Sequence, residues 1–162
     1  MRLGLEKLLY RLWGGLPIPN WLRWIILWAG NQKFLIGVAA VVLDENENVL
    51  FFKHTYRPEM PWGLPGGWLK KNENPARAVE REICEESGLV VEVLHPLWVT
   101  ERNHVAGLDI IYLGRPVSGV FRPSVEVSEA RYFALKDFPV VYPDTEEIIG
   151  MAIERTRKAK YP

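Results

Sequence analysis

The stretch from Leu64 to Leu89, LPGGWLKKNENPARAVEREICEESGL, constrains this chain more than any other segment. Asn74 is followed by Pro75, and an asparagine cap with proline at the first helical position is a strong helix start. Gly88 is the matching stop, because glycine readily takes the left-handed conformation that ends helices. The pattern predicts a sharp glycine turn, a short polar loop and then a helix over 75–87.

Three glutamates of this helix are expected to share one face. With Glu82 at the origin of a helical wheel, Glu86 lies near +40° and Glu85 near −60°, at about 100° per residue. Like charges this close repel one another, so they form either a solvated charged face or a site for a hard cation. Oxygen ligands without His or Cys suit Mg²⁺ or Mn²⁺, which also bind substrate phosphates. The cation alternative favours attack of water on a phosphoanhydride.

The remainder of the chain alternates apolar segments with turn signals. Six segments are predicted as strands, at 34–43, 49–56, 89–101, 109–117, 118–123 and 129–135. The second is expected to be the hairpin partner of the first, and Pro96 to mark a bulge or an edge in the third. Thr145 is expected to cap a last helix that ends near Lys158. Strands in runs with two well-placed helices predict an α/β (α+β) sandwich, a mixed sheet covered by helices on both faces.

The spacing around the acidic helix resembles a known signature. Five residues separate Gly67 from Glu73, seven separate Glu73 from Arg81, and the run REICEESGL follows to Leu89. Every specified position of the Nudix box is filled, so the chain resembles the Nudix hydrolases from about residue 34 to about residue 139. The resemblance implies an α/β/α sandwich over 31–162 and Mg²⁺-dependent hydrolysis of a nucleoside diphosphate linked to another moiety, such as ADP-ribose or a nucleotide sugar.

The resemblance also implies roles for individual residues. The expected catalytic side chains are Glu73, Arg81, Glu82, Glu85 and Glu86. The three glutamates of the helix face would bind the metal, and the carbonyl of Gly67 would complete the coordination. Glu73 and Arg81 would pair to hold the loop against the helix. Two other activities fit the same fold: a house-cleaning pyrophosphatase for oxidised or non-standard nucleoside triphosphates, and a nucleotide-sensing module, which normally has an eroded box.

Substrate contacts are expected outside the box. Arg57 precedes the glycine turn and would bind phosphate or form a surface salt bridge, and Trp62 would stack on a base or pack the turn. Arg102 is a further phosphate candidate, and Glu126 lies in a loop that in some relatives reaches the metal. Weaker candidates are Lys53, His54 and His104 for phosphate, Glu129 as a further carboxylate, and Trp98, Phe138 and Tyr142 for a base.

Residues 1–30 lie outside the resemblance and hold four of the seven tryptophans, at 13, 21, 24 and 28. Helical spacing predicts a helix over 2–13 and a second over 21–29, capped by Asn20. The aromatic residues would dock on the main domain or form a homodimer, the favoured alternative, or contact a membrane surface peripherally. A net charge of +0 argues against nucleic acid as partner, and the single Cys84 fits a reducing cytoplasm.

Overall fold

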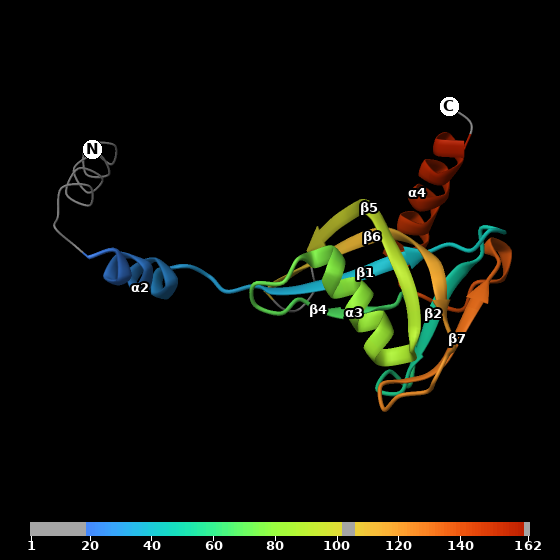
Figure 1. Cartoon of the computed structure of the whole chain (residues 1–162), viewed down its shortest axis with the longest axis horizontal. Coiled ribbons are helices and arrows are strands. Elements are labelled where there is room, and N and C mark those ends of the chain that lie inside the picture. The colour runs from blue at the N-terminus through green and yellow to red at the C-terminus, as the bar shows by residue number, and fades with distance from the viewer. Residues whose placement is uncertain (1–18, 102–105, 161–162) are drawn as a thin grey trace. The chain divides into compact units, whose positions relative to one another are not determined.

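The computed structural model describes residues 19–101 and 106–160 of the chain. The chain consists of two compact units, Met1–Lys33 and Phe34–Pro162. The boundary expected from the sequence follows residue 30. Helix α2 (Asn20–Gly30) belongs to the first unit (Figure 1). The helix predicted over 2–13 lies outside the described residues. No described helix is both long enough and apolar enough to cross a membrane.

Helix α2 begins one residue earlier than expected. Asn20 is its first helical residue rather than its cap, and no side chain caps this end. The backbone amides of Leu22 and Arg23 instead bond to the carbonyl of Pro19, at 3.0 and 3.2 Å. The predicted cap was therefore wrong, because a carbonyl satisfies the first amides of the helix.

The second unit contains two sheets and three helical segments. The strands are β1 (Leu35–Val42), β2 (Val49–His54), β3 (Trp62–Gly63), β4 (Gly66–Trp68), β5 (Leu89–Glu101), β6 (Gly107–Gly119) and β7 (Val127–Phe133). The helical segments are α3 (Pro75–Ser87), the 3-10 turn η1 (Leu135–Asp137) and α4 (Pro143–Lys160). Four strands form a mixed sheet in the order β4-β1-β6-β5, and three form an antiparallel sheet in the order β3-β2-β7.

Strand β2 is not the hairpin partner of β1, contrary to the prediction. Both edges of β1 are occupied, by β4 in antiparallel and by β6 in parallel orientation. A single bridge between Leu43 and Val49 joins the end of β1 to β2, which continues between β3 and β7. The short polar turn after β1 therefore carries the chain from one sheet to the other, which the turn residues alone do not reveal.

The pairing of β5 with β6 also differs from the expectation in part. The segments 109–117 and 118–123 were predicted as separate strands, but β6 is continuous from Gly107 to Gly119 because β5 pairs along its length. The predicted bulge at Pro96 is confirmed, since the register shifts between Pro96 and Trp98. Proline cannot donate to the ladder, so the strand accommodates it by an irregularity.

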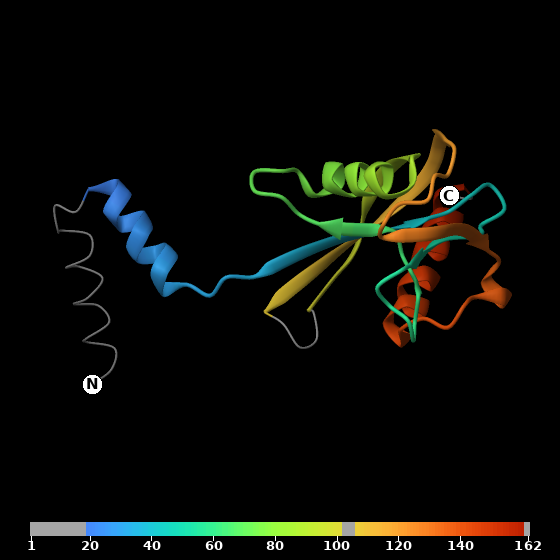
Figure 2. The same ribbon diagram turned by 90° about the horizontal axis from the view of Figure 1, so that it is seen from below.

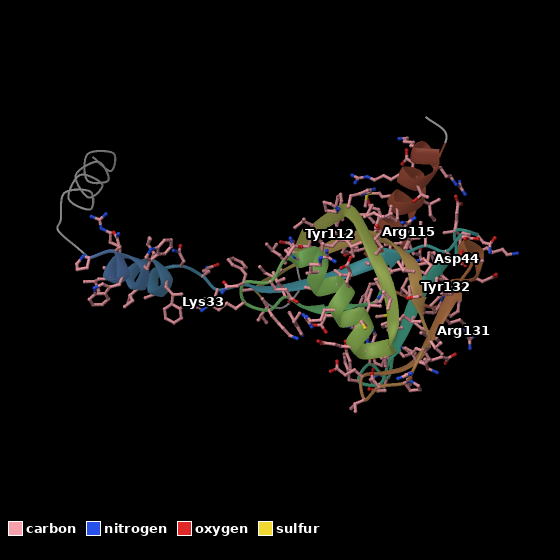
Figure 3. The ribbon with its side chains drawn as sticks, in the orientation of Figure 1. Lys33, Asp44, Tyr112, Arg115, Arg131 and Tyr132 are labelled. Carbon is pink, nitrogen blue, oxygen red and sulfur yellow. The ribbon has the colours of Figure 1, made fainter. Side chains whose placement is uncertain are left out.

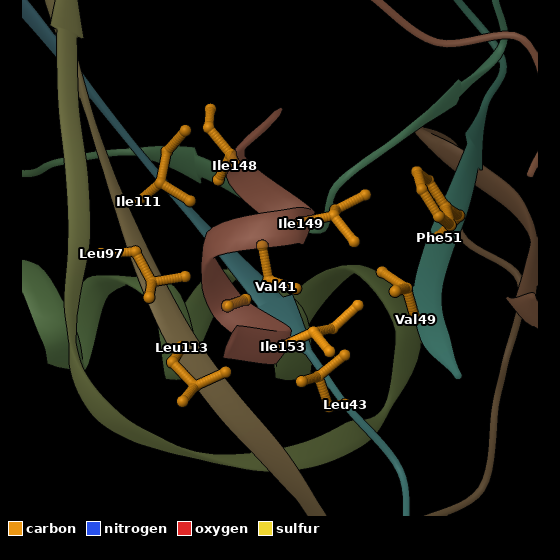
Figure 4. Packing of buried hydrophobic residues seen from close by; sticks show 11 residues of the cluster. Val41, Leu43, Val49, Phe51, Leu97, Ile111, Leu113, Ile148, Ile149 and Ile153 are labelled. Carbon is orange, nitrogen blue, oxygen red and sulfur yellow. The ribbon is translucent and has the colours of Figure 1, made fainter. Parts of the chain in front are cut away.

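Strand β1 is the centre of the core and is buried on both faces. Val38, Ala40 and Val42 pack with apolar residues of α3, whereas Val41 and Leu43 pack with isoleucines of α4. Figure 4 shows the second cluster, in which α4 lies over β1 and β6. Figures 1 and 2 show α3 and α4 on opposite faces of the sheet. The predicted sandwich of helices on both faces is confirmed.

The two helices predicted in this unit are both present. Helix α3 begins and ends as predicted: the Asn74 side chain accepts a hydrogen bond from the Ala76 amide at 2.9 Å, and Gly88 ends the helix with φ of 72°. Helix α4 begins two residues before Thr145, whose amide bonds to the Tyr142 carbonyl at 2.9 Å. Thr145 therefore lies in the first turn, and its prediction as the cap was wrong.

Candidate active site

The glycine turn brings the backbone of β4 into close contact with two neighbours. A Cβ atom on Gly66 would lie 2.1 Å from the carbonyl oxygen of Val38, so only glycine fits beside β1. A Cβ atom on Gly67 would lie 2.5 Å from Cδ of Glu82. The carboxylate of Glu82 therefore rests directly against the turn.

Arg81 organises the acidic face of α3. Its Nε and Nη2 donate to the two carboxylate oxygens of Glu73, at 2.6 and 2.9 Å, which confirms the predicted pairing. Its Nη1 donates to Glu82 at 2.7 Å and to Glu85 at 2.9 Å. The bond from Arg81, together with one from the Lys70 amide, lowers the pKa of Glu73 to about 2. The loop before α3 is thus fixed to the helix by an ion pair.

Glu86 differs from its neighbours because no cation of the described residues forms an ion pair with it. Its side chain is 9% exposed, and its Oε2 has no hydrogen-bond partner among the described residues. Burial raises the pKa of Glu86 to about 7, with further contributions from Glu126 and Glu82, while Arg57 partly opposes the shift. The carboxylates of α3 therefore form a partly exposed cluster in which the charge of Glu86 is not balanced by a cation of the described residues.

The predicted metal ligands are not gathered into a ready-made cage. Within residues 19–101 and 106–160, no three His, Cys, Asp or Glu side chains converge so as to hold a metal ion. The guanidinium of Arg81 bonds to oxygens of both Glu82 and Glu85. The donor chemistry nevertheless fits a hard divalent cation, since the groups are all carboxylates and the Glu86 Oε2 is unpartnered.

A cleft of about 470 Å³ lies beside this face. Gly67 contributes to its wall, and so do three of the four predicted substrate contacts, Arg57, Trp62 and Glu126. The fourth, Arg102, lies outside the described residues, as does His104. A cleft of this volume is large enough for a small nucleotide-sized ligand.

Trp62 packs on the core and also reaches the cleft, so base stacking stays a prediction. Its ring meets the edge of Phe133 at a centroid distance of 5.1 Å, so it packs on the core. Lys53 and Arg131 lie 5.8 and 5.9 Å from its centroid, and the ring also lines the cleft. Arg131 is labelled on β7 in Figure 3. Trp62 is thus a fixed aromatic surface with positive charge beside it.

His54 lines the cleft as a neutral group. Its side chain is 4% exposed, and neither ring nitrogen has a hydrogen-bond partner among the described residues. Burial, assisted by the positive charge of Arg57, lowers the pKa of His54 to about 4. At neutral pH it offers one donor and one acceptor rather than a positive charge for phosphate.

Sequence reasoning missed Tyr56, Asp109 and Thr145 as parts of the cleft wall. Asp109 offered a usable signal, because it is a carboxylate beside the apolar run of β6. Of the weaker candidates, Tyr142 lines the cleft. Phe138 instead packs on Phe51 in the core, with their ring centroids 5.6 Å apart.

Trp98 and Glu129 stand apart from the described cleft wall. The Trp98 side chain is 43% exposed on β5. Glu129 pairs with Lys53 at 3.5 Å and with Arg131. Their suggested roles as base-stacking group and additional metal carboxylate therefore gain no support from the cleft geometry.

The family follows from a comparison with known domains. The family model described as NUDIX domain matches residues 33–151, so the chain belongs to the Nudix family. An ADP-ribose pyrophosphatase of Methanocaldococcus jannaschii is 30% identical over 115 residues, which cover 67% of each chain. The mouse 8-oxo-dGDP phosphatase NUDT18 is 35% identical over 88 residues, which cover 54% of this chain and 27% of that protein. The chain thus spans only about a quarter of the mouse relative.

Solved structures agree on the fold. A Streptococcus suis ADP-ribose pyrophosphatase superposes with a TM-score of 0.67 at 26% identity, over 77% of this chain and 93% of that one. A UDP-X diphosphatase superposes with a TM-score of 0.69 at 18% identity, over 96% of this chain and 80% of that one. The second likeness concerns the fold alone.

Proposed function

We propose that this chain is a pyrophosphohydrolase that uses Mg²⁺, or Mn²⁺, to hydrolyse the diphosphate of a nucleoside diphosphate linked to another moiety, with ADP-ribose as the leading substrate. One observation carries the proposal. Glu86 keeps a buried, unpartnered carboxylate oxygen close to Glu82 and Glu126, beside a cleft that contains Arg57. Uncompensated negative charge beside a cleft with an arginine in its wall suits a metal ion and a phosphate group together.

The residues of the box would divide the work of holding the metal. Glu82, Glu85 and Glu86 are the proposed ligands, with the Gly67 carbonyl as a further oxygen. When bound, the cation would supply positive charge to the phosphate oxygens and acidify a water molecule. Arg81 holds the loop against the helix through Glu73, and this pairing keeps the turn in register with the carboxylates.

The cleft residues would orient the substrate. Arg57 would bind the diphosphate, because a guanidinium donates to phosphate oxygens in a fixed fork. Trp62 would contact the base or the sugar with its exposed ring face. Glu126 lies in the cleft wall and influences the charge of Glu86, so it is suited to accept a proton from the attacking water.

Two relatives support ADP-ribose as the leading substrate, since the proteins of M. jannaschii and S. suis are both named ADP-ribose pyrophosphatases. The mouse relative, named 8-oxo-dGDP phosphatase, supports the house-cleaning alternative. A reducing, cytoplasmic location is part of the proposal, on the basis of the single Cys84.

A substrate panel tests the proposal. The purified chain is incubated with Mg²⁺ and either ADP-ribose, a nucleotide sugar, 8-oxo-dGDP or 8-oxo-dGTP, and the products are identified by mass. We expect AMP and ribose 5-phosphate from ADP-ribose, and no turnover when a chelator removes the metal. Preferred cleavage of an 8-oxo nucleotide would select the alternative. Absence of turnover on every compound, or equal turnover by the Glu82→Gln variant, would refute a hydrolase with this site.

A further inference from the structure

Helix α2 exposes an unusually large apolar surface. None of its residues is buried. Trp21, Trp24 and Trp28 are 64%, 72% and 69% exposed, and Ile25 is 51% exposed. At about 100° per residue these four side chains form one face about 100° wide, with Trp21 and Trp28 between Trp24 and Ile25. Exposed patches of large apolar residues mark interaction sites, so we expect this face to bind a partner.

The polar groups next to this face are positive or neutral. Residues 19–33 contain no aspartate or glutamate. The ammonium group of Lys33, labelled in Figure 3, lies 4.0 Å from the ring centroid of Trp28. A lysine beside an exposed tryptophan is the arrangement that interfacial helices use at lipid headgroups.

The formal charge of the chain is unevenly distributed between its two units. Residues 1–33 contain five basic residues and one acidic residue, a formal charge of +4. Residues 34–162 contain fifteen basic and nineteen acidic residues, a formal charge of −4, so the chain as a whole is neutral. The apolar face therefore belongs to the positive segment of an otherwise acidic protein, which is a basis for selecting a negatively charged partner.

We propose that α2 is an interfacial anchor that binds the surface of a membrane containing anionic lipids. Trp21, Trp24, Ile25 and Trp28 enter the boundary between headgroups and acyl chains, and Lys33 stays at the headgroups. An eleven-residue helix is roughly 16 Å long, about half the thickness of the hydrocarbon core, so α2 lies in the surface rather than across it.

A second copy of the chain is one of the two other occupants that the sequence suggested, the main domain being the other. A two-fold dimer places the same surface patch of each copy against the other. Here that contact brings two segments of +4 together, and their repulsion opposes it, whereas an anionic lipid surface attracts each segment. Charge complementarity therefore favours the membrane. The inference is independent of the substrate and of the hydrolytic reaction.

Vesicle sedimentation of the full chain tests this anchor. Vesicles of phosphatidylcholine alone are compared with vesicles that also contain phosphatidylserine, at low and high salt. We expect binding to the anionic vesicles that weakens with salt, because screening shortens the range of the attraction. The double variant Trp24→Glu with Ile25→Glu should bind roughly 100-fold more weakly, and Lys33→Gln about five-fold more weakly.

Val120→Glu provides a matched control, because Val120 is 76% exposed in the second unit and gains the same kind of charge. It should bind vesicles as the unchanged protein does. Hydrolysis by the double variant reports that the second unit is still folded. Three results would overturn the proposal: no binding to either vesicle, equal binding to both, or a dimer in sedimentation velocity that the double variant abolishes without any lipid binding.

Discussion

The most informative perturbation is Glu86→Gln, because it should stabilise the metal-free protein while it removes activity. Burial and neighbouring carboxylates raise the pKa of Glu86 from 4.5 to about 7. A folded pKa above the unfolded value means that the contribution of Glu86 to stability is greatest below pH 4.5 and falls as pH rises through 7. At pH 8 the ionised carboxylate costs at most about 3 kcal/mol, from 1.36 kcal/mol per pKa unit.

The glutamine variant recovers only part of that cost. Its amide carries no charge, but it leaves polar atoms in the same buried position, at a cost of about 1 kcal/mol or more. We therefore expect a net gain of about 1–2 kcal/mol at pH 8 in EDTA. For a chain of this size that gain raises Tm by roughly 3–6 °C. At pH 5 the folded wild-type carboxyl is mostly protonated, so the gain should nearly vanish.

Thermal unfolding of both proteins in EDTA at pH 5 and pH 8 measures the difference directly. Glu85→Gln is the matched control, since it removes the same charge one position earlier from a side chain that is 54% exposed and bonded to Arg81. It should give no stabilisation at pH 8. Addition of Mg²⁺ should stabilise the wild type more than Glu86→Gln, because ligand binding to the native state adds to its stability. Equal Tm values of the two proteins at pH 8 would refute the assignment of Glu86 as an uncompensated buried charge.

Three further predictions concern the turn, the cleft and the cap. Gly67→Ala should displace the Glu82 side chain and lower kcat about 100-fold. Its Tm should change little, because the flexible Glu82 side chain can move away from the new methyl group. In Gly66→Ala the methyl group meets backbone atoms instead, so this variant should destabilise the fold by about 3 kcal/mol. Since the pKa of His54 is lowered from 6.5 to about 4, stability should fall as pH drops from 6.5 towards 4, and a His54→Gln variant in urea titrations should lose this dependence. Asn74→Ala should cost about 1 kcal/mol in urea unfolding, and an unchanged midpoint would contradict its role as the cap.

Local rules predicted α3 well because its boundaries are set by neighbours in the sequence. Asn74, Pro75 and Gly88 each act within one turn of the helix, so their effect does not depend on the rest of the fold. Strand pairing is different. The turn between β1 and β2 looks like a hairpin loop, but the pairing is decided by which other strands compete for the edges of β1. Sequence distance carries no information about that competition.

The site was predictable in composition but not in arrangement. The spacing of the box predicted the pairing of Glu73 with Arg81, because the ion pair closes a short loop. The sequence did not predict that Arg81 would also bond to Glu82 and Glu85, or that the Oε2 of Glu86 would have no partner among the described residues. Such sharing depends on side-chain positions in three dimensions. The wall of the cleft likewise combines residues from β2, β6 and α4, which no local pattern connects.

Helix α3 explains why stability and function conflict at Glu86. One side of the helix packs against the sheet through Ala78, Val79 and Ile83, all fully buried. The opposite side carries exposed charges, and Glu86 lies at the boundary between the two. At that position the carboxylate is too buried for water to compensate its charge. Under the proposed function the destabilising charge would favour cation binding, since a fully solvated carboxylate would gain less from the cation.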